Sequence, residues 1–291
     1  MRLAWARARR CAAQSPPPVR MRSLAMSMLF TRHHSATRSM PLVARDSGLF
    51  NIDLPTFPRS DNRLEVLEGL EMLEGLDRQS SIDSSMSLLD VGGSVWPCAS
   101  VLCTWLHNNE QLVCGASVLE LGSGTGACGL YASGLGASRV LLTDGSEGLL
   151  QLIAANRERN ARLLPSTSRV DIEQLQWNDV PAPAGPWDLV IGSDVTYGYE
   201  PDAQVALAAT LSELLRAAGS SPRVLLAHQH RDRKPDEAVA RWDDRDETIR
   251  WFSEAAAAVG LEVSQLQSQM PPPDSEAREI SIVEVRLASG G

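Results

Sequence analysis

The sequence predicts a three-layer α/β protein built on a doubly wound, mostly parallel sheet of seven strands. Strand and helix patterns alternate from about residue 88 onward, which is typical of a parallel sheet with helices on both faces. A glycine-rich turn at residues 122–126 links the first predicted strand to a helix. The last two predicted strands have only a loop between them, so we expect them to pair antiparallel and to leave a reversed strand at one edge of the sheet.

Short apolar segments predict the strands. The first reads Ser-Val-Leu-Glu-Leu, and the third alternates apolar and polar residues as a half-buried strand does. The seven predicted strands are residues 117–121, 139–143, 170–177, 187–192, 223–227, 261–266 and 279–287.

Capping residues mark the predicted helices. Pro97 stands in the first turn of one helix, where a missing N–H costs nothing. Gly219 and Gly260 follow the ends of two others, where glycine is favoured. The predicted helices are residues 97–106, 127–135, 147–160, 201–218 and 247–259.

The region before this pattern divides into two parts. Residues 1–45 hold nine Arg and no Asp or Glu, which fits a disordered leader or a transit peptide. Residues 46–87 form an N-terminal cover segment, expected to be a short strand pair or irregular chain, because the Leu-Glu-Gly-Leu repeat at residues 64–76 drifts around a helix. Residues 88–291 form the main domain.

The net charge of the chain indicates which classes of partner it favours. The formal net charge is −9, and without the nine leading Arg the chain keeps 18 basic residues against 36 acidic ones, about −18. Such a body disfavours nucleic acid and favours a basic protein surface. A monomer in the cytoplasm is expected, with the mitochondrion or chloroplast as the alternative if the leader is a transit peptide.

Two classes of site find no support in the sequence. No apolar run reaches the roughly 18 residues of a bilayer span, so no membrane association is predicted. The cysteines form no CxxC pair, so no metal site is predicted.

The turn Gly122-Ser-Gly-Thr-Gly126 predicts a nucleotide-type ligand. Glycines let a ligand approach the backbone, and the following helix start offers free N–H groups. Gly124-Thr-Gly-Ala-Cys-Gly129 also matches the dinucleotide fingerprint, with Asp144 about 20 residues on to bind ribose hydroxyls. The glycine spacing alone leaves NAD and S-adenosylmethionine open.

Three features favour S-adenosylmethionine. Glu120 precedes Gly122 by two residues and gives E-x-G-x-G-x-G. The closing strands fit a seven-stranded sheet whose last strand is reversed. No basic residue stands beside Asp144 to bind a pyrophosphate.

Four stretches carry a more specific resemblance. They are Gly93-Ser-Val-Trp-Pro97, Val118-Leu-Glu-Leu-Gly-Ser-Gly-Thr-Gly-Ala-Cys-Gly-Leu130, Leu175-Gln-Trp177 and Asp188-Leu-Val-Ile-Gly-Ser-Asp-Val-Thr-Tyr197. With them the chain resembles the class I, seven-strand methyltransferases of Rossmann-like fold. Among these it is similar to methyltransferase family 16, the lysine methyltransferases of non-histone proteins.

The resemblance implies a set of residues around the methyl donor. It implies that Trp96 covers the donor, that Asp144 binds its ribose and that Trp177 lies by the adenine, where an aromatic face is a suitable neighbour. Ser193 departs mildly from the Ala that the family often has. The full set implied for the donor is Trp96, Glu120, Gly122, Ser123, Gly124, Asp144, Trp177 and Ser193.

The segment Asp194-Val-Thr-Tyr197 is the candidate acceptor site. It follows the fourth strand, at the edge where open α/β sheets bind ligands. A lysine amine arrives protonated and must lose a proton before it attacks. Asp194 is the candidate that orients the N–H bonds, and Tyr197 is expected to form an aromatic wall. The expected partner is a protein that presents a lysine.

Other readings stay open. The acceptor is alternatively an arginine, a histidine or a small-molecule amine, because the fold does not fix it. An NAD-dependent oxidoreductase and a non-catalytic binding module are further alternatives. Arg231 is expected in a solvated loop, with substrate contact as its alternative, and His228 or His230 is a remote candidate for a catalytic base.

Overall fold

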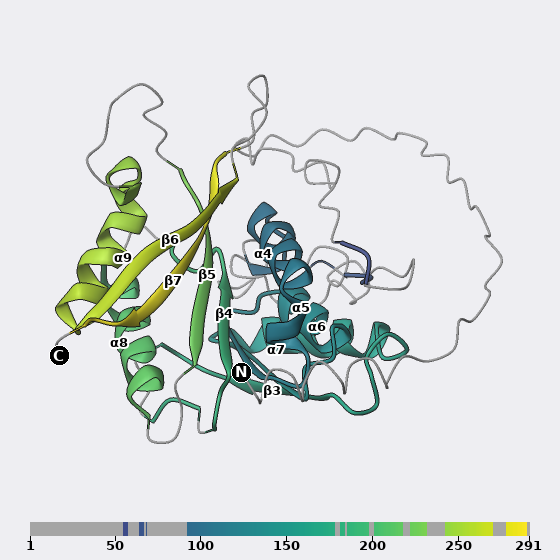
Figure 1. Cartoon of the computed structure of the whole chain (residues 1–291). Coiled ribbons are helices and arrows are strands. Elements are labelled where there is room, and N and C mark those ends of the chain that lie inside the picture. The colour runs from purple at the N-terminus through teal and green to yellow at the C-terminus, as the bar shows by residue number, and fades with distance from the viewer. Residues whose placement is uncertain are drawn as a thin grey trace, which may run out of the picture.

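The protein is built on one seven-stranded sheet. The computed structural model describes residues 55–57, 64–66, 68, 92–177, 181–183, 185–197, 201–217, 222–231, 242–269 and 278–289. The sheet has the strand order β3-β2-β1-β4-β5-β7-β6, of which Figure 1 shows the part from β4 to β6. The strands are β1 (Ser117–Leu121), β2 (Arg139–Asp144), β3 (Arg169–Gln174), β4 (Leu189–Ser193), β5 (Arg223–Gln229), β6 (Leu261–Gln269) and β7 (Ile280–Leu287). The predicted fold class is confirmed.

The reversed strand is β7, but it does not lie at an edge. It pairs antiparallel with β5 on one side and with β6 on the other. The expectation of a reversed edge strand is therefore wrong. The cause is the composition of the two closing strands: β7 is mostly apolar and is buried along most of its length, whereas β6 is mostly polar and is largely exposed. The more apolar strand takes the inner position, which is covered on both faces.

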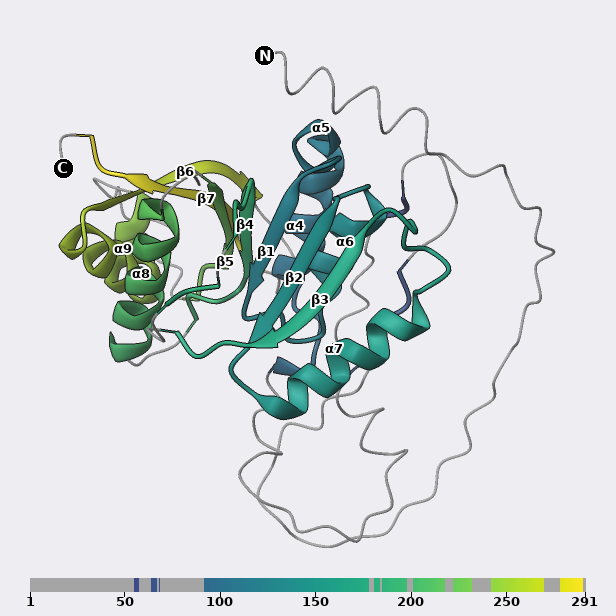
Figure 2. The same ribbon diagram turned by 90° about the horizontal axis from the view of Figure 1, so that it is seen from below.

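Helices cover both faces of the sheet, as Figure 2 shows. In β1, Val118 packs in the core on the side of α4, α6 and α7, whereas Leu119 and Leu121 pack on the side of α8 and α9. Successive residues of a strand point to opposite faces, which produces these two cores. The helices are α4 (Pro97–Asn108), α5 (Glu110–Val113), α6 (Ala127–Gly134), α7 (Glu147–Arg159), α8 (Pro201–Arg216), η1 (Trp242–Arg245) and α9 (Glu247–Ala258).

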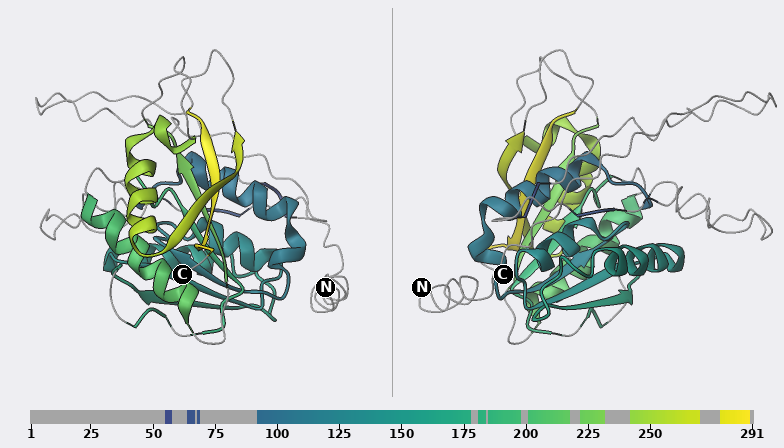
Figure 3. Two further views of the ribbon diagram at one scale, coloured as in Figure 1. Left: turned by 60° about the vertical axis from the view of Figure 1, so that its left-hand side comes forward. Right: turned by 90° about the vertical axis from the view of Figure 1, so that its right-hand side faces the viewer.

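Several boundaries differ from the predicted ones. The short helices α5 and η1 were not predicted. Strand β3 ends at Gln174, where its pairing with Asp144 ends, so Trp177 lies in the loop beyond it. Strand β4 begins at Leu189, two residues later than predicted. Helices α8 and α9 lie against the same side of the sheet (Figure 3).

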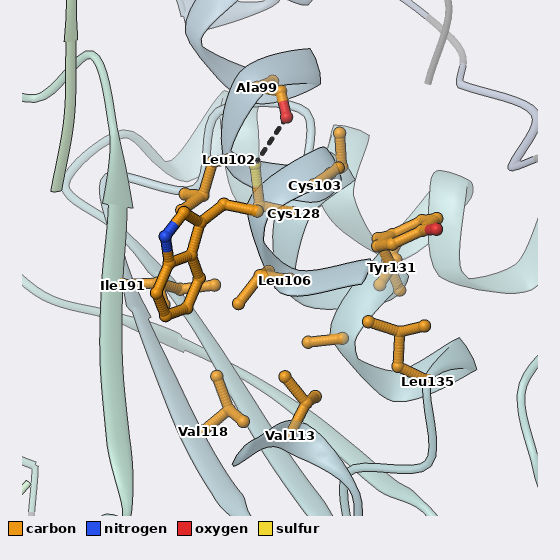
Figure 4. Packing of buried hydrophobic residues seen from close by; sticks show 14 of the residues in the cluster. Ala99, Leu102, Cys103, Leu106, Val113, Val118, Cys128, Tyr131, Leu135 and Ile191 are labelled. Carbon is orange, nitrogen blue, oxygen red and sulfur yellow. Dashed lines mark hydrogen bonds between the residues drawn. The ribbon is translucent and has the colours of Figure 1, made fainter. Parts of the chain in front are cut away.

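Helices α4 and α6 are locked together beside the carboxyl edge of the sheet. Leu102 and Leu106 of α4 are fully buried against α6, as Figure 4 shows. The Cys128 thiol donates to the Ala99 carbonyl oxygen at 3.9 Å. This packing fixes the start of α4 next to the glycine turn that precedes α6.

The described parts of the predicted cover segment, residues 46–87, are irregular and pack on this helical layer. Phe57 stacks on Tyr131 with ring centroids 4.9 Å apart, and the Tyr131 hydroxyl donates to the Thr56 carbonyl oxygen at 3.0 Å. The Glu65 N–H donates to the side chain of Asn160 at 2.8 Å, and that side chain donates back to the Glu65 carbonyl oxygen at 2.7 Å. This segment therefore contacts both α6 and the end of α7.

A third contact ties the same segment to the start of α4. The Val95 N–H donates to Glu68 Oε1 at 2.8 Å.

The predicted leader at residues 1–45 lies outside the described residues. In the part of the chain that the structure describes, no helix is long and apolar enough to cross a membrane.

Candidate functional site

The glycine turn after β1 combines a left-handed backbone with close contacts that leave no room for a side chain. Gly122 and Gly124 have φ of 60° and 55°, in the left-handed region. A Cβ on Gly124 would lie 2.5 Å from the Gly92 carbonyl oxygen. A Cβ on Gly122 would lie 2.8 Å from Cγ1 of Val195 and 3.5 Å from Cζ2 of Trp177. The turn is therefore closely surrounded, and it presents bare backbone at the carboxyl edge.

Asp144 holds this turn from the end of β2. Its Oδ2 accepts from the Gly124 N–H at 3.0 Å, and its Oδ1 accepts from the Ser146 N–H at 3.0 Å. Burial raises the pKa of Asp144, although the backbone hydrogen bonds act in the opposite direction. A carboxylate has about four lone-pair sites, so both oxygens of Asp144 can accept further hydrogen bonds from hydroxyl groups.

Ser123 is bonded into the sheet. Its Oγ accepts from the Thr143 N–H at 3.0 Å, and its N–H donates to the Thr143 carbonyl oxygen at 2.8 Å. These bonds join the glycine turn to β2, so its position is set by the sheet.

Glu120 lies beneath the turn. Its carboxylate is buried and accepts from the Gly129 N–H at 2.9 Å. A Cβ on Gly129 would lie 2.7 Å from that oxygen, which explains a glycine inside α6. Burial raises the pKa of Glu120 to about 8. The observed contact holds the start of α6, and the donor contact of Glu120 stays a prediction.

Three more of the expected donor residues lie at the same edge. Trp177 is half-buried beside Gly122. Trp96 precedes α4 in extended conformation, in a segment that passes from Gly92 at the glycine turn to Cys98. Ser193 ends β4 and is half-buried. The structure thus places the residues that the sequence assigned to the donor in five separate segments, which end or begin on the carboxyl side of the sheet.

Asp194 directly follows β4 and is 6% exposed. Its φ is 57°, the one positive φ of a described residue other than glycine. Its Oδ2 accepts from the Arg231 guanidinium at 2.6 Å, whereas its Oδ1 is buried without a hydrogen-bond partner among the described residues. Burial, the charge of Asp194 and a side-chain interaction with that carboxylate raise the pKa of the Cys98 thiol, although the charge of Arg231 acts in the opposite direction. Residue 98 therefore lies beside this carboxylate.

The expectation of a solvated Arg231 is wrong. Its side chain is 16% exposed. Its guanidinium carbon lies 5.6 Å from the ring centroid of Tyr197, and its Nη1 donates to the Gln229 carbonyl oxygen at 3.0 Å. Burial alone would lower the pKa of Arg231, but the bond to Asp194 raises it. The ion pair is the reason that this cation leaves solvent.

Tyr197 is 42% exposed. One face of its ring is next to the Arg231 guanidinium, and Asp194 lies three residues before it in the same loop. This loop joins an exposed aromatic ring to a buried carboxylate. The two predicted acceptor residues therefore lie within one small site.

Sequence reasoning missed the residues that support this loop. The Thr196 hydroxyl lies 2.7 Å from His228 Nδ1, and His228 Nε2 lies 3.3 Å from Asp246 Oδ2. His228 is fully buried and uses both ring nitrogens, so it is not placed to act as a base on a substrate amine. The available signal was position: His228 lies near the end of β5 and Arg231 just beyond it, and this end lies beside that of β4.

Comparisons with known proteins agree with this geometry. A family model described as lysine methyltransferase matches residues 77–242. Protein N-lysine methyltransferase METTL21A of Danio rerio is 36% identical over 113 residues, which are 38% of this chain and 50% of that protein. Calmodulin-lysine N-methyltransferase of Arabidopsis thaliana is 31% identical over 140 residues, 47% of this chain and 45% of that protein.

A third relative carries a different acceptor in its name. Histone-arginine methyltransferase METTL23 of Mus musculus is 30% identical over 159 residues, 52% of this chain and 59% of that protein. The chain spans about half the length of the curated relatives it matches.

Replacing Glu120 with Gln should change how stability depends on pH. The pKa of Glu120 is about 8 in the folded protein against an ordinary 4.5, so the folded protein keeps a proton that the unfolded chain releases. The resulting stabilisation is full below the ordinary pKa and is lost as the pH rises to about 8. Gln stays neutral and can still accept from the Gly129 N–H.

We therefore expect Glu120→Gln to gain stability relative to the wild type, by on the order of 1 kcal/mol per pH unit between about pH 5 and pH 8. Urea unfolding at a series of pH values measures this difference. Glu173→Gln, at an exposed position of β3, is the control and should show no trend. Parallel curves for Glu120→Gln and the wild type would contradict the neutral state of Glu120.

Proposed function

Because the chain belongs to the lysine methyltransferase family, we propose that it transfers a methyl group from S-adenosylmethionine to a lysine side chain of a protein. The observation that carries the proposal is the buried Asp194 carboxylate, which has one oxygen paired with Arg231 and the other without a partner among the described residues. This oxygen lies at the edge of the sheet that also carries the glycine turn.

The residues at this edge fit the methyl donor. Gly122 and Gly124 let the turn pack closely on Val195 and on the Gly92 carbonyl group, and Asp144 can accept from ribose hydroxyls. Trp177 offers a flat apolar face suited to an adenine. When bound, S-adenosylmethionine supplies a methyl group on a positively charged sulfur. We propose Trp96, Gly122, Ser123, Gly124, Asp144, Trp177 and Ser193 as the residues that hold it, with Glu120 supporting the turn from below.

Asp194 would bind and orient the acceptor amine. A lysine amine has a reference pKa of about 10.4 and reaches the site as an ammonium ion. The Oδ1 atom of Asp194 is a buried acceptor without a partner among the described residues, and a buried carboxylate oxygen favours a charged donor. A hydrogen bond from the amine to Oδ1 fixes the direction of its lone pair after deprotonation. The proton leaves through water at the exposed side of the site.

Arg231 limits the charge of the acceptor site. By binding Oδ2, it compensates part of the negative charge of Asp194. A carboxylate whose charge is partly compensated binds an ammonium ion less tightly than an unpaired carboxylate does. The bound amine therefore loses its proton more easily. Tyr197 forms an aromatic wall that separates the amine from solvent.

The substrate is proposed to be a protein with a basic surface around the lysine. The chain carries a formal net charge of −9, and complementary charge raises the rate of encounter between partners. We propose a monomer that acts in the cytoplasm, or in an organelle if the leader is a transit peptide.

A second acceptor class has one observation in its favour. The Asp194 carboxylate already binds a guanidinium, that of Arg231, and a relative is named a histone-arginine methyltransferase. A substrate arginine that displaces Arg231 would find the same planar acceptor. A histidine, a small-molecule amine and a binding role without catalysis stay as alternatives with no structural observation behind them.

The donor should stabilise the protein. Saturation with S-adenosylmethionine at about 100 times its Kd should add about 2.7 kcal/mol, which corresponds to a Tm increase of roughly 5–10 °C for a domain of this size. Its demethylated product should act similarly, and NAD should not. Thermal unfolding with each ligand measures this.

Asp144→Ala should reduce the shift in Tm strongly, because the variant loses both the ribose acceptor and the bond to Gly124. Asp171→Ala, on β3 away from the turn, is the matched control and should keep the shift. An unchanged Tm of the wild type with the donor and its product would rule out the donor site.

Replacing Asp194 with Asn should abolish methyl transfer. The amide keeps the shape of the side chain but loses the charge that binds the amine, so labelling of proteins in a lysate by methyl-labelled donor should fall by about 100-fold or more. The donor-induced shift in Tm should persist, which shows that the variant is folded.

Asp188→Asn is the matched control. Asp188 lies just before β4, at the amino ends of the parallel strands and so at the opposite end from Asp194. Its Oδ2 accepts from the Ser117 N–H at 2.9 Å there. This variant should label proteins as the wild type does. Normal labelling by Asp194→Asn would show that the acceptor site is elsewhere.

A further inference from the structure

A buried set of hydrogen bonds lies directly behind the acceptor loop. It begins at the Thr196 hydroxyl, which lies 2.7 Å from His228 Nδ1. It continues from His228 Nε2 to Asp246 Oδ2 at 3.3 Å. These three residues are 0%, 0% and 2% exposed. A side chain from the acceptor loop is thus connected, through β5, to the start of α9.

Asp246 joins three parts of the chain. Its Oδ1 accepts from the Thr248 N–H at 2.8 Å and from the Thr248 hydroxyl at 2.7 Å, which caps α9. Its Oδ2 accepts from the Arg231 N–H as well as from His228. Burial alone would raise the pKa of Asp246, but the hydrogen bond to His228 holds it well below its usual range. The group is therefore an anion that fixes the chain just after β5.

Both ends of this network reach the acceptor pair. Thr196 follows Asp194 by two residues. Arg231 is held through its backbone by Asp246, and its guanidinium binds Asp194 Oδ2 at 2.6 Å. Asp194 itself has a left-handed backbone, a conformation that Asp adopts more readily than most residues with a Cβ.

We propose that Asp246 and His228 are positioning residues that hold Asp194 and Arg231 in the geometry of the acceptor site. The proposal rests on the proposed function for its catalytic consequence. Asp246 fixes the backbone of Arg231, and His228 fixes the Thr196 hydroxyl. Together they set both the residue that binds the amine and the residue that pairs with it, without contact to the substrate.

The same side chains could also be interpreted as a nucleophilic triad or as a metal site, and their contacts argue against both interpretations. The order hydroxyl, imidazole, carboxylate is that of a nucleophilic triad, but Thr196 is fully buried and cannot meet a substrate. The ligand atoms of His228, His230 and Asp246 lie within 4.8 Å of one another. Both ring nitrogens of His228 and both oxygens of Asp246 already take part in hydrogen bonds, so a metal would have to displace them.

Asp246→Asn is the sharpest test. Asn is also a good helix N-cap, so the cap of α9 is kept, while the charge that binds His228 and the Arg231 N–H is lost. We expect amide hydrogen exchange in residues 193–197 to rise about tenfold or more, as 1.4 kcal/mol of lost local stability implies. We expect kcat/KM for the protein substrate to fall by about 100-fold, while the Kd of S-adenosylmethionine changes by less than about twofold.

Two further variants keep the test decisive. His228→Gln preserves a polar group facing Asp246 but not the one facing Thr196, so it should raise exchange at residues 193–197 even if Asp246→Asn does not fold. His107→Gln is the control, a histidine of α4 whose Nδ1 lies 3.0 Å from the Tyr131 hydroxyl and which is not part of this network. It should leave exchange at residues 193–197 unchanged.

The proposal is overturned if exchange at residues 193–197 is the same in the wild type, Asp246→Asn and His228→Gln. It is also overturned if the wild type binds one zinc ion that a chelator removes with the same rise in exchange, because the cluster would then be a metal site. If the wild type methylates no protein, the proposed function fails, but hydrogen exchange still tests the network.

Discussion

The buried ion pair between Asp194 and Arg231 is the interaction on which the proposed acceptor site depends. A buried carboxylate is costly unless it is paired, and here one oxygen is paired while the other has no partner among the described residues. The pair forms because β4 and β5 are parallel neighbours, so that the chain segments following them emerge side by side at one edge. The arginine makes burial of the carboxylate possible and leaves one oxygen for a cation from outside.

The proposed acceptor loop and the glycine turn pack directly against each other. Val195 lies against Gly122, so the loop that carries the acceptor carboxylate packs on the turn proposed to hold the methyl donor. The segment from Gly92 to Cys98 lies against both, and Glu68 holds it through the Val95 N–H. Transfer between two bound groups requires their distance to be fixed to a fraction of an ångström. A rigid sheet edge with interlocking loops meets this requirement better than separate flexible loops.

Local patterns were sufficient to predict the sheet, its helices and the glycine turn, because strand and helix periodicity are encoded over a few residues. The inner position of β7 was missed because it depends on a comparison of the apolar content of the two closing strands, and not on the periodicity within either strand. Arg231 stands in a polar run that reads as a solvated loop, and its partner is 37 residues away. The same holds for the hydrogen bonds among Thr196, His228 and Asp246. They join three segments that are distant in the sequence, so no local pattern predicts them. The residues proposed to bind the donor could be named from the sequence because most of them lie at or just after strand ends, in family-specific motifs, and their contact with the donor stays a prediction.

The central claim is methyl transfer to a protein lysine, and mass spectrometry of the modified peptide tests it most directly. The full chain would be incubated with a lysate and a donor carrying an isotopically labelled methyl group, and the labelled protein would be digested. The expected result is a labelled methyl group on a lysine Nζ, absent when Asp194→Asn replaces the wild type. Label on an arginine or a histidine, or no labelled protein from an enzyme that binds the donor, would contradict the claim.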